Sequence, residues 1–94
     1  MRSYELMFIV HPDLDESEFN EVVDKVKGWI TDSGGQVDNL DLWGKRRLAY
    51  PIQKQLEGQY VLMNTQLDPT FCSNLEHSLG LQEPVMRFLI TAEE

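Results

Sequence analysis

The sequence predicts an α+β fold in which four antiparallel strands form one sheet and two helices cover one of its faces. Apolar residues alternate with a period of two in four segments and recur at steps of three and four in two others. The order of these segments is strand, helix, strand, strand, helix, strand. Two right-handed strand–helix–strand units in this order form a ferredoxin-like split βαβ sandwich, predicted here as a single domain over residues 1–94.

The first strand and the first helix have the most regular patterns. Residues 2–10 form the strand, and they become apolar on both faces, as is typical of a strand inside a sheet. The helix begins at Asp15, whose side chain can cap it, and Glu18 stands where a capping box needs it. The pair Gly34-Gly35 supplies the left-handed residue that ends the helix. The apolar stripe of this helix consists of Phe19, Val22, Val23, Val26, Trp29 and Ile30.

A long strand follows over residues 37–52. Gly44 in its middle predicts a bend or a bulge. Pro51 fits only an edge strand or a strand end, because proline cannot donate a hydrogen bond to a neighbouring strand. The apolar residues predicted to share one face of this strand are Leu40, Leu42, Leu48, Tyr50 and Ile52.

The second half of the chain repeats the pattern. Residues 53–58 are predicted as a hairpin loop and residues 59–67 as the returning strand. Asp68, followed by a proline, starts the second helix. The last strand is predicted over residues 85–91, with Met86, Phe88 and Ile90 alternating along it.

One face of the predicted sheet is left without a helix. Strand parity places apolar side chains on that face, and contiguous exposed apolar area usually marks a surface for a partner. The residues predicted to bind a protein partner are Met7, Ile9, Tyr60, Leu62 and Leu89.

Composition indicates an ordinary globular protein, with 41% hydrophobic and 26% charged residues. The single cysteine, Cys72, lies in an apolar helical pattern, so nothing suggests an oxidising compartment. The first residues lack the apolar core and the cleavage site of a signal peptide, so we expect none. The longest apolar run, residues 6–10, is far shorter than the roughly 20 residues that span a bilayer. We therefore expect a soluble, intracellular protein that has no membrane partner.

Charge is distributed very unevenly along the chain. The formal net charge is -8, which as a whole predicts repulsion from nucleic acid. Residues 1–42 carry a net -7 and residues 55–94 a net -5, whereas residues 43–54 carry four basic side chains and no acidic one. The chain therefore has one positive segment in an acidic body.

No group of residues predicts catalysis, a cofactor, a metal or a small-molecule substrate. His11 and His77 lie on different elements and lack the spacing of metal ligands. Cys72 has no neighbouring cation in the sequence to lower its pKa, so we interpret it as a small core residue. The acidic residues around 13–18 lack the glycine and the terminal glutamate of a calcium loop, and they are explained by helix capping.

The positive segment has two interpretations. Three consecutive basic residues on an edge strand can simply prevent edge-to-edge aggregation. Arginines beside aromatic residues, confined to one place by an acidic body, instead favour RNA binding. The candidate RNA-binding residues are Arg2, Lys45, Arg46, Arg47, Lys54 and Arg87.

Residues 44–52, with the sequence GKRRLAYPI, resemble the signature of a ribosomal protein family, that of the sixth protein of the bacterial small subunit. The resemblance extends over nearly the whole chain and includes residues 1–5, the His11-Pro12 turn, residues 60–64 and residues 85–87. It implies a ferredoxin-like constituent of the small subunit, in the cytoplasm or in an organelle. It also implies that the chain pairs with the eighteenth small-subunit protein and binds the central domain of the small-subunit rRNA as that pair.

Two other functions fit the same fold. A sensor of small molecules or an acyl-phosphate enzyme would need a phosphate-binding glycine loop or paired catalytic groups, but Gly34-Gly35 is explained by helix termination. An independent RNA-recognition module would read bases on its central strands. The third strand lacks the basic-aromatic-glycine pattern of such modules, and Tyr60 and Leu62 suit a protein partner at least as well.

Overall fold

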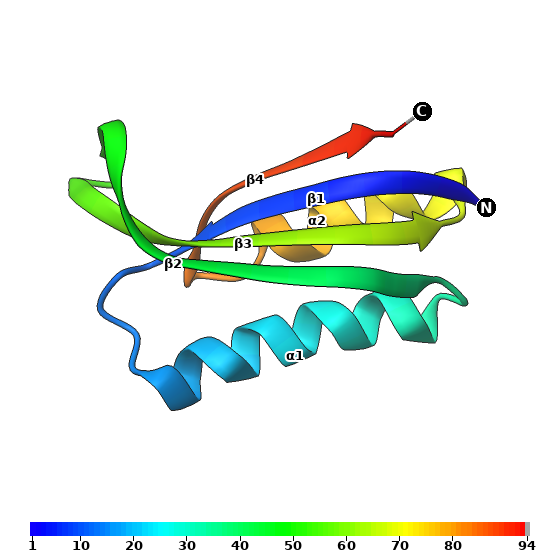
Figure 1. Cartoon of the computed structure of the whole chain (residues 1–94), viewed down its shortest axis with the longest axis horizontal. Helices are drawn as coiled ribbons and strands as arrows, with labels where there is room; N and C mark the ends of the chain where they lie inside the picture. Colours follow the sequence, from blue (N-terminus) through cyan, green and yellow to red (C-terminus); the bar gives the residue numbers. More distant parts are fainter. Residues whose placement is uncertain (94) are drawn as a thin grey trace.

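The computed structural model describes residues 1–93 and has the predicted architecture (Figure 1). The strands are ordered β2-β3-β1-β4 in one sheet, and every neighbouring pair is antiparallel. Side chains from both helices pack in one cluster with β1 and β3, so both helices lie on the same face of the sheet. The elements are β1 (Arg2–Val10), α1 (Glu16–Asp32), β2 (Gln36–Ile52), β3 (Gln55–Leu67), the 3₁₀ helix η1 (Pro69–Phe71), α2 (Cys72–Gly80) and β4 (Val85–Ala92).

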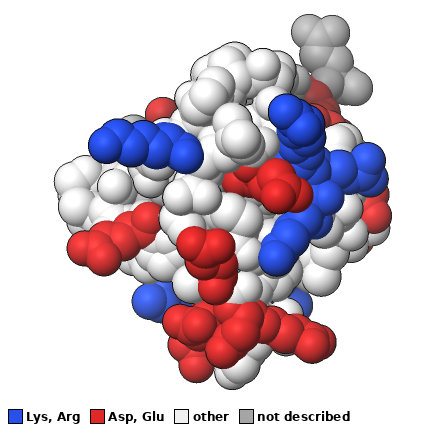
Figure 2. All heavy atoms as spheres, turned by 90° about the vertical axis from the view of Figure 1, so that its left-hand side faces the viewer, with Lys and Arg blue, Asp and Glu red and all other residues white. Residues whose placement is uncertain are grey.

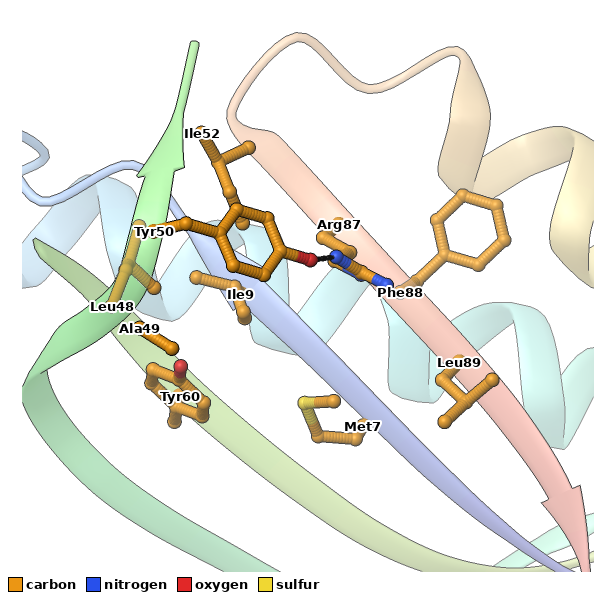
Figure 3. Close-up of a pocket in the computed structure, with 10 residues that line it drawn as sticks. All are labelled: Met7, Ile9, Leu48, Ala49, Tyr50, Ile52, Tyr60, Arg87, Phe88 and Leu89. Carbon is orange, nitrogen blue, oxygen red and sulfur yellow. Dashed lines mark hydrogen bonds between the residues drawn. The ribbon is translucent and has the colours of Figure 1, made fainter. Parts of the chain in front are cut away.

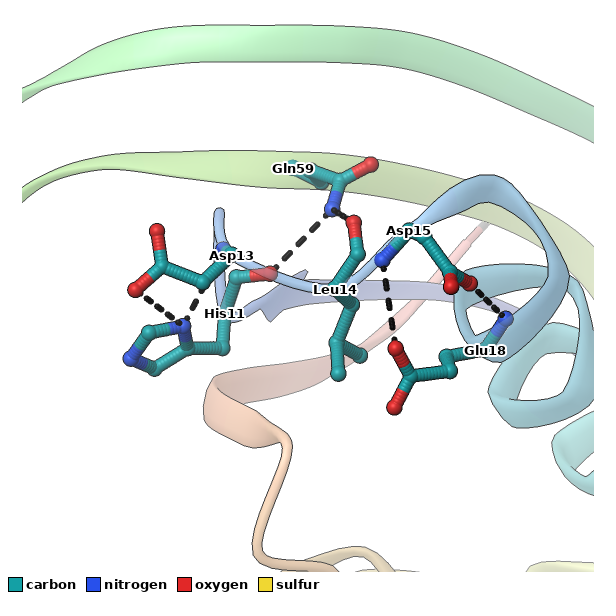
Figure 4. Close-up of polar contacts among 6 residues, drawn as sticks. All are labelled: His11, Asp13, Leu14, Asp15, Glu18 and Gln59. Atoms are coloured by element: carbon teal, nitrogen blue, oxygen red, sulfur yellow. Dashed lines mark hydrogen bonds and ion pairs between the residues drawn. The ribbon is translucent and has the colours of Figure 1, made fainter.

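Helix α1 begins and ends as predicted. The Glu18 backbone N–H donates to Asp15 Oδ1 at 2.8 Å, and the Asp15 N–H donates to Glu18 Oε1 at 3.5 Å, which completes the capping box (Figure 4). Gly34, just past the last turn, has a φ of +92°. The Gln59 side chain on β3 donates to the carbonyls of His11 and Leu14, at 3.1 and 3.4 Å (Figure 4). These bonds hold the segment between β1 and α1 against the sheet.

The core lies between the sheet and the helices. The residues almost completely removed from solvent include Leu6 and Phe8 of β1, Val61 and Met63 of β3, Val26 and Ile30 of α1, and Leu75 and Leu79 of α2. Burial of apolar area is the main force that favours folding. The predicted strand parity is therefore confirmed for β1 and β3 on this face.

The β2–β3 connection is shorter than the predicted loop over residues 53–58. Gln53 and Lys54 alone form the turn, with φ of 51° and 66°, and β3 begins at Gln55. Positive φ at both central positions suits the right-handed twist of a hairpin. Such turns usually contain Gly or Asn, and neither residue is present here to mark one.

Shifts in strand register change which face a side chain occupies, and two of them shape the helix-free face. At Gly44 the β2–β3 register shifts, so Leu40 packs on the helix-covered face whereas Leu48 packs on the other face. The predicted single face for β2 is therefore wrong. A second shift, between β1 and β4, places Met86 on the helix-free face, while Phe88 packs against the helix-side core.

The second helical segment starts as a single 3₁₀ turn. Both the backbone N–H and the hydroxyl of Thr70 donate to Asp68 Oδ1, at 2.9 and 2.8 Å. The backbone bond is the largest of the effects that lower the pKa of the Asp68 carboxyl below its ordinary value. No helix within residues 1–93 has the length and apolar character to cross a membrane.

Candidate nucleic-acid and partner interface

The far end of the β2–β3 hairpin leaves the plane of the sheet and curls away from α1 (Figure 1). Between this end of the hairpin and the helix-free face lies a hollow of about 230 Å³ (Figure 3). Residues from all four strands line it, so the hollow is a product of the tertiary fold and not of one segment. The lining residues are Met7, Ile9, Leu48, Ala49, Tyr50, Ile52, Tyr60, Arg87, Phe88 and Leu89.

Ile9 was predicted to be open to a partner, but it is only 3% exposed. It is covered by the chain's own hairpin and forms a small second cluster with Leu48 and Met86. Gly58 makes this contact possible, because a Cβ atom at that position would lie 2.3 Å from Ile9 Cγ2. Ile9 therefore attaches the hairpin to the sheet and is not available as a docking residue.

The other four predicted partner residues remain accessible on this face. Strand register places Met7 opposite Leu62 on one side and opposite Leu89 on the other. Met7, Tyr60 and Leu62 are half-buried, and Leu89 is 56% exposed. Met7, Tyr60 and Leu89 line the hollow, and Leu62 extends the apolar surface beyond it.

A polar contact spans the mouth of the hollow. The Arg87 Nη1 group on β4 donates to the Tyr50 hydroxyl on β2, and the guanidinium carbon lies 5.8 Å from the centre of the Tyr50 ring (Figure 3). Arg87 was predicted to bind RNA with the basic segment, but it faces the hollow. Tyr50 was not among the predicted site residues, because its contact with β4 joins strands that are far apart in the sequence.

The basic residues of β2 lie together near the hairpin end. Lys45, Arg46 and Arg47 are exposed, and among residues 1–93 no carboxylate forms an ion pair with any of them. Lys54 is at the turn of the same hairpin. Arg2 is far from this group, because it pairs with Leu67 at the opposite end of β3. The structure therefore brings four of the six predicted RNA-binding residues into one segment.

The charges on this end of the molecule are unevenly distributed. Figure 2 shows the densest group of acidic side chains at the bottom, over the start of α1, and most of the basic side chains above it, with further acidic side chains among and beside them. A polyanion is therefore repelled most strongly from the bottom of this end.

An aromatic and cationic stack accompanies the basic residues. The rings of Trp43 and Tyr60 are nearly parallel, with centroids 6.2 Å apart and an angle of 10° between their planes. The Arg46 guanidinium carbon lies 5.8 Å from the Trp43 ring centre, and Arg46 Nε donates to the Trp43 carbonyl at 3.2 Å. Trp43 was only noted as a neighbour of the cations in the sequence; the shift at Gly44 is what turns it toward Tyr60.

Nothing in the part of the chain that the structure describes resembles a metal or catalytic centre. Within residues 1–93 no three metal-ligating side chains come together. His11 contacts Asp13, with Nδ1 and Oδ2 3.8 Å apart (Figure 4), and His77 is exposed on α2. Cys72 is half-buried beside the core, somewhat less enclosed than predicted.

Comparison with known proteins gives one family. The family model for ribosomal protein S6 matches residues 3–92. The small ribosomal subunit protein bS6 of Caldanaerobacter subterraneus is 47% identical over 90 residues, which cover 96% of this chain and 95% of that protein. The bS6 protein of Clostridium botulinum strain Loch Maree is 46% identical over the full length of both chains. The crystal structure of 30S ribosomal protein S6 from Thermotoga maritima superimposes with a TM-score of 0.93 at 30% identity and covers 98% of this chain and 87% of that one.

Proposed function

Because this chain belongs to the ribosomal protein S6 family of bacterial small-subunit proteins, we propose that it binds small-subunit rRNA jointly with a basic partner, the eighteenth small-subunit protein. Proteins of this family are structural components of the ribosome in the cytoplasm and are not enzymes. The acyl-phosphate alternative is therefore discarded.

The charge distribution carries the proposal. The net charge of -8 opposes binding to a phosphate backbone, yet Lys45, Arg46, Arg47 and Lys54 are on one exposed hairpin. Four cations can position a protein on RNA, but they supply only a few of the contacts that make binding tight. A basic partner bound beside them would supply the rest.

The helix-free face supports the same proposal. Leu89 and Tyr50 line the hollow and are more than half exposed, and half-buried Leu62 extends the apolar surface beyond it. Apolar surface around a concave centre is typical of protein interfaces, whose cores exclude charge. The partner is therefore expected to cover this face, while RNA contacts the basic hairpin.

The test is a titration of the purified chain with a central-domain rRNA fragment, with and without the eighteenth small-subunit protein. We expect the isolated chain to bind near the nonspecific range of roughly 10⁻⁴ to 10⁻⁶ M, and the pair to bind much more tightly. An unrelated basic protein serves as the control for charge alone. Nanomolar binding by the isolated chain at physiological salt would contradict the proposal and would favour an independent RNA-recognition module.

A further inference from the structure

We propose that the exposed indole of Trp43 is a stacking platform for one unpaired RNA base. This inference rests on the proposed function and extends it, because it assigns a base contact in addition to the phosphate contacts of the cations. Trp43 is 47% exposed although it is one of the largest apolar side chains of the chain. Aromatic rings at the surface of RNA-binding proteins commonly stack on unpaired bases.

The ring is held in a defined orientation. Tyr60 lies nearly parallel to it and packs against one of its faces. Tyr60 is in turn part of the small cluster around Ile9, so the platform is attached to the central strands of the sheet. A ring that is already oriented loses little conformational freedom when a ligand stacks on it.

The backbone directs Trp43 to this position. Leu42 pairs with Val61 and Gly44 pairs with Tyr60, so Trp43 is the additional residue of a bulge. Gly44 has a φ of +76°, a conformation that residues with a Cβ rarely adopt. Bulges of this kind often turn a side chain toward a functional site.

Charge favours RNA over protein as the occupant. Lys45, Arg46 and Arg47 follow Trp43 directly, and among residues 1–93 they are not neutralised by ion pairs. A basic partner protein is repelled by this group, whereas a nucleotide brings a phosphate to it. Bases inside an RNA helix have no free face, so the occupant is a nucleotide from a loop, a bulge or a strand end.

The side chain of Arg46 also lies near the Trp43 ring. Its contact with the Trp43 ring is a surface cation–π contact, which is weaker than the stacking of a base. When a base takes the ring face, the long Arg46 side chain can turn to the phosphate of the same nucleotide. The base then replaces the Arg46 guanidinium on the ring, and the guanidinium is not left as a buried, unpaired charge.

The test uses tryptophan fluorescence in the complex of this chain with its basic partner. A Trp29→Phe variant leaves Trp43 as the only tryptophan in the chain. Adding the rRNA fragment should quench its emission in parallel with binding. In the Trp29→Phe background the partner alone should leave most of the emission unchanged.

Affinity measurements separate stacking from packing. Trp43→Phe keeps a stacking ring and should bind RNA within about 3-fold of the parent, whereas Trp43→Leu keeps only apolar contact with Tyr60 and should bind about 10-fold more weakly. Leu42→Ala is the matched control, because Leu42 is an adjacent exposed apolar residue on the other side of the bulge and should have no effect. Denaturant midpoints verify that each variant is folded.

Each outcome decides the inference. RNA binding without quenching, or equal affinities of the Phe and Leu variants, overturns the platform and leaves the proposed function intact. Quenching by the partner alone assigns Trp43 to a protein interface and also overturns it. A pair that does not bind the rRNA fragment at all overturns both proposals.

Discussion

The two faces of the sheet differ in how completely the chain buries them. On the helix-covered face, Leu6, Phe8 and Met63 are fully removed from solvent by residues of this chain. On the other face, a small cluster around Ile9 packs against Leu48 of the curled hairpin, and Leu89 remains 56% exposed. Alternate residues of one strand therefore have different roles: one set holds the fold together, and the other remains for a partner.

The largest expected effect is the loss of a side chain from the helix-covered face. Leu6→Ala should lower the free energy of unfolding by about 2–5 kcal/mol, because it leaves a cavity in a fully buried site. Urea denaturation, analysed for both midpoint and slope, measures the change.

Met7→Ala is the matched control for this prediction, since Met7 is the next residue of β1 and lies half-buried on the other face. It should cost about 1 kcal/mol of stability and should instead weaken partner binding. If Met7→Ala proved the more destabilising of the two, the assignment of the faces would be inverted by one residue.

The next effect concerns the contact that brings the hairpin onto the helix-free face. Gly58→Ala should destabilise the fold by about 1–3 kcal/mol, because its Cβ would lie 2.3 Å from Ile9 Cγ2 and the hairpin would have to move. Gly28→Ala on α1 is the control, since a Cβ there meets nothing within 4 Å and alanine favours helix. It should be neutral or stabilise the protein by up to about 1 kcal/mol. Equal destabilisation by both variants would argue against the packing explanation.

A third comparison uses the same residue type on each face. Tyr60→Ala should weaken binding of the basic partner by about 1–3 kcal/mol, because large aromatic side chains at concave surfaces often dominate interface energies. Tyr4→Ala, which removes a tyrosine packed against the helix-side core, should reduce stability and leave partner affinity nearly unchanged. Calorimetric titration and urea denaturation of both variants test the pair. Similar partner affinities for the two would place the partner elsewhere.

The sequence predicted the helix-covered face well because its signals are local. The spacing of the α1 stripe, the capping box at Asp15 and the alternation along β1 each depend on neighbouring residues only. Tertiary packing buries the same faces that these local signals define, so the predictions agree with the folded structure.

The helix-free face was predicted less well because its geometry depends on irregularities between strands. Gly44 was expected to bend β2, but the resulting exchange of faces for Leu48 follows from pairing with β3. No glycine next to Met86 marks the bulge between β1 and β4, and the turn at Gln53 contains neither Gly nor Asn. The distance of Arg2 from the basic hairpin could have been found, since antiparallel pairing places the start of β1 at the end of β3.

The smallest expected effect on stability distinguishes the two interpretations of the basic hairpin. Arg46→Ala together with Arg47→Ala should change the free energy of unfolding by no more than about 0.5 kcal/mol, because both side chains are exposed and form no ion pair with residues 1–93. Binding of rRNA by the protein pair should nevertheless weaken. The slope of log affinity against log salt should become shallower by up to about 2, since each phosphate contact contributes up to about one unit.

The control is Lys25→Ala together with Lys27→Ala, which also removes two positive charges but from α1, away from the hairpin. It should leave that salt slope unchanged. If both double variants shift the slope equally, only the total charge of the protein matters. If neither shifts it and the arginine variant self-associates in sedimentation experiments, the cations serve to protect the edge of β2 against pairing with another sheet. If this hairpin binds RNA, the salt slope changes in the arginine variant and not in the lysine variant. Counterions are released where a cation contacts a phosphate, so only the loss of contacting cations alters the slope.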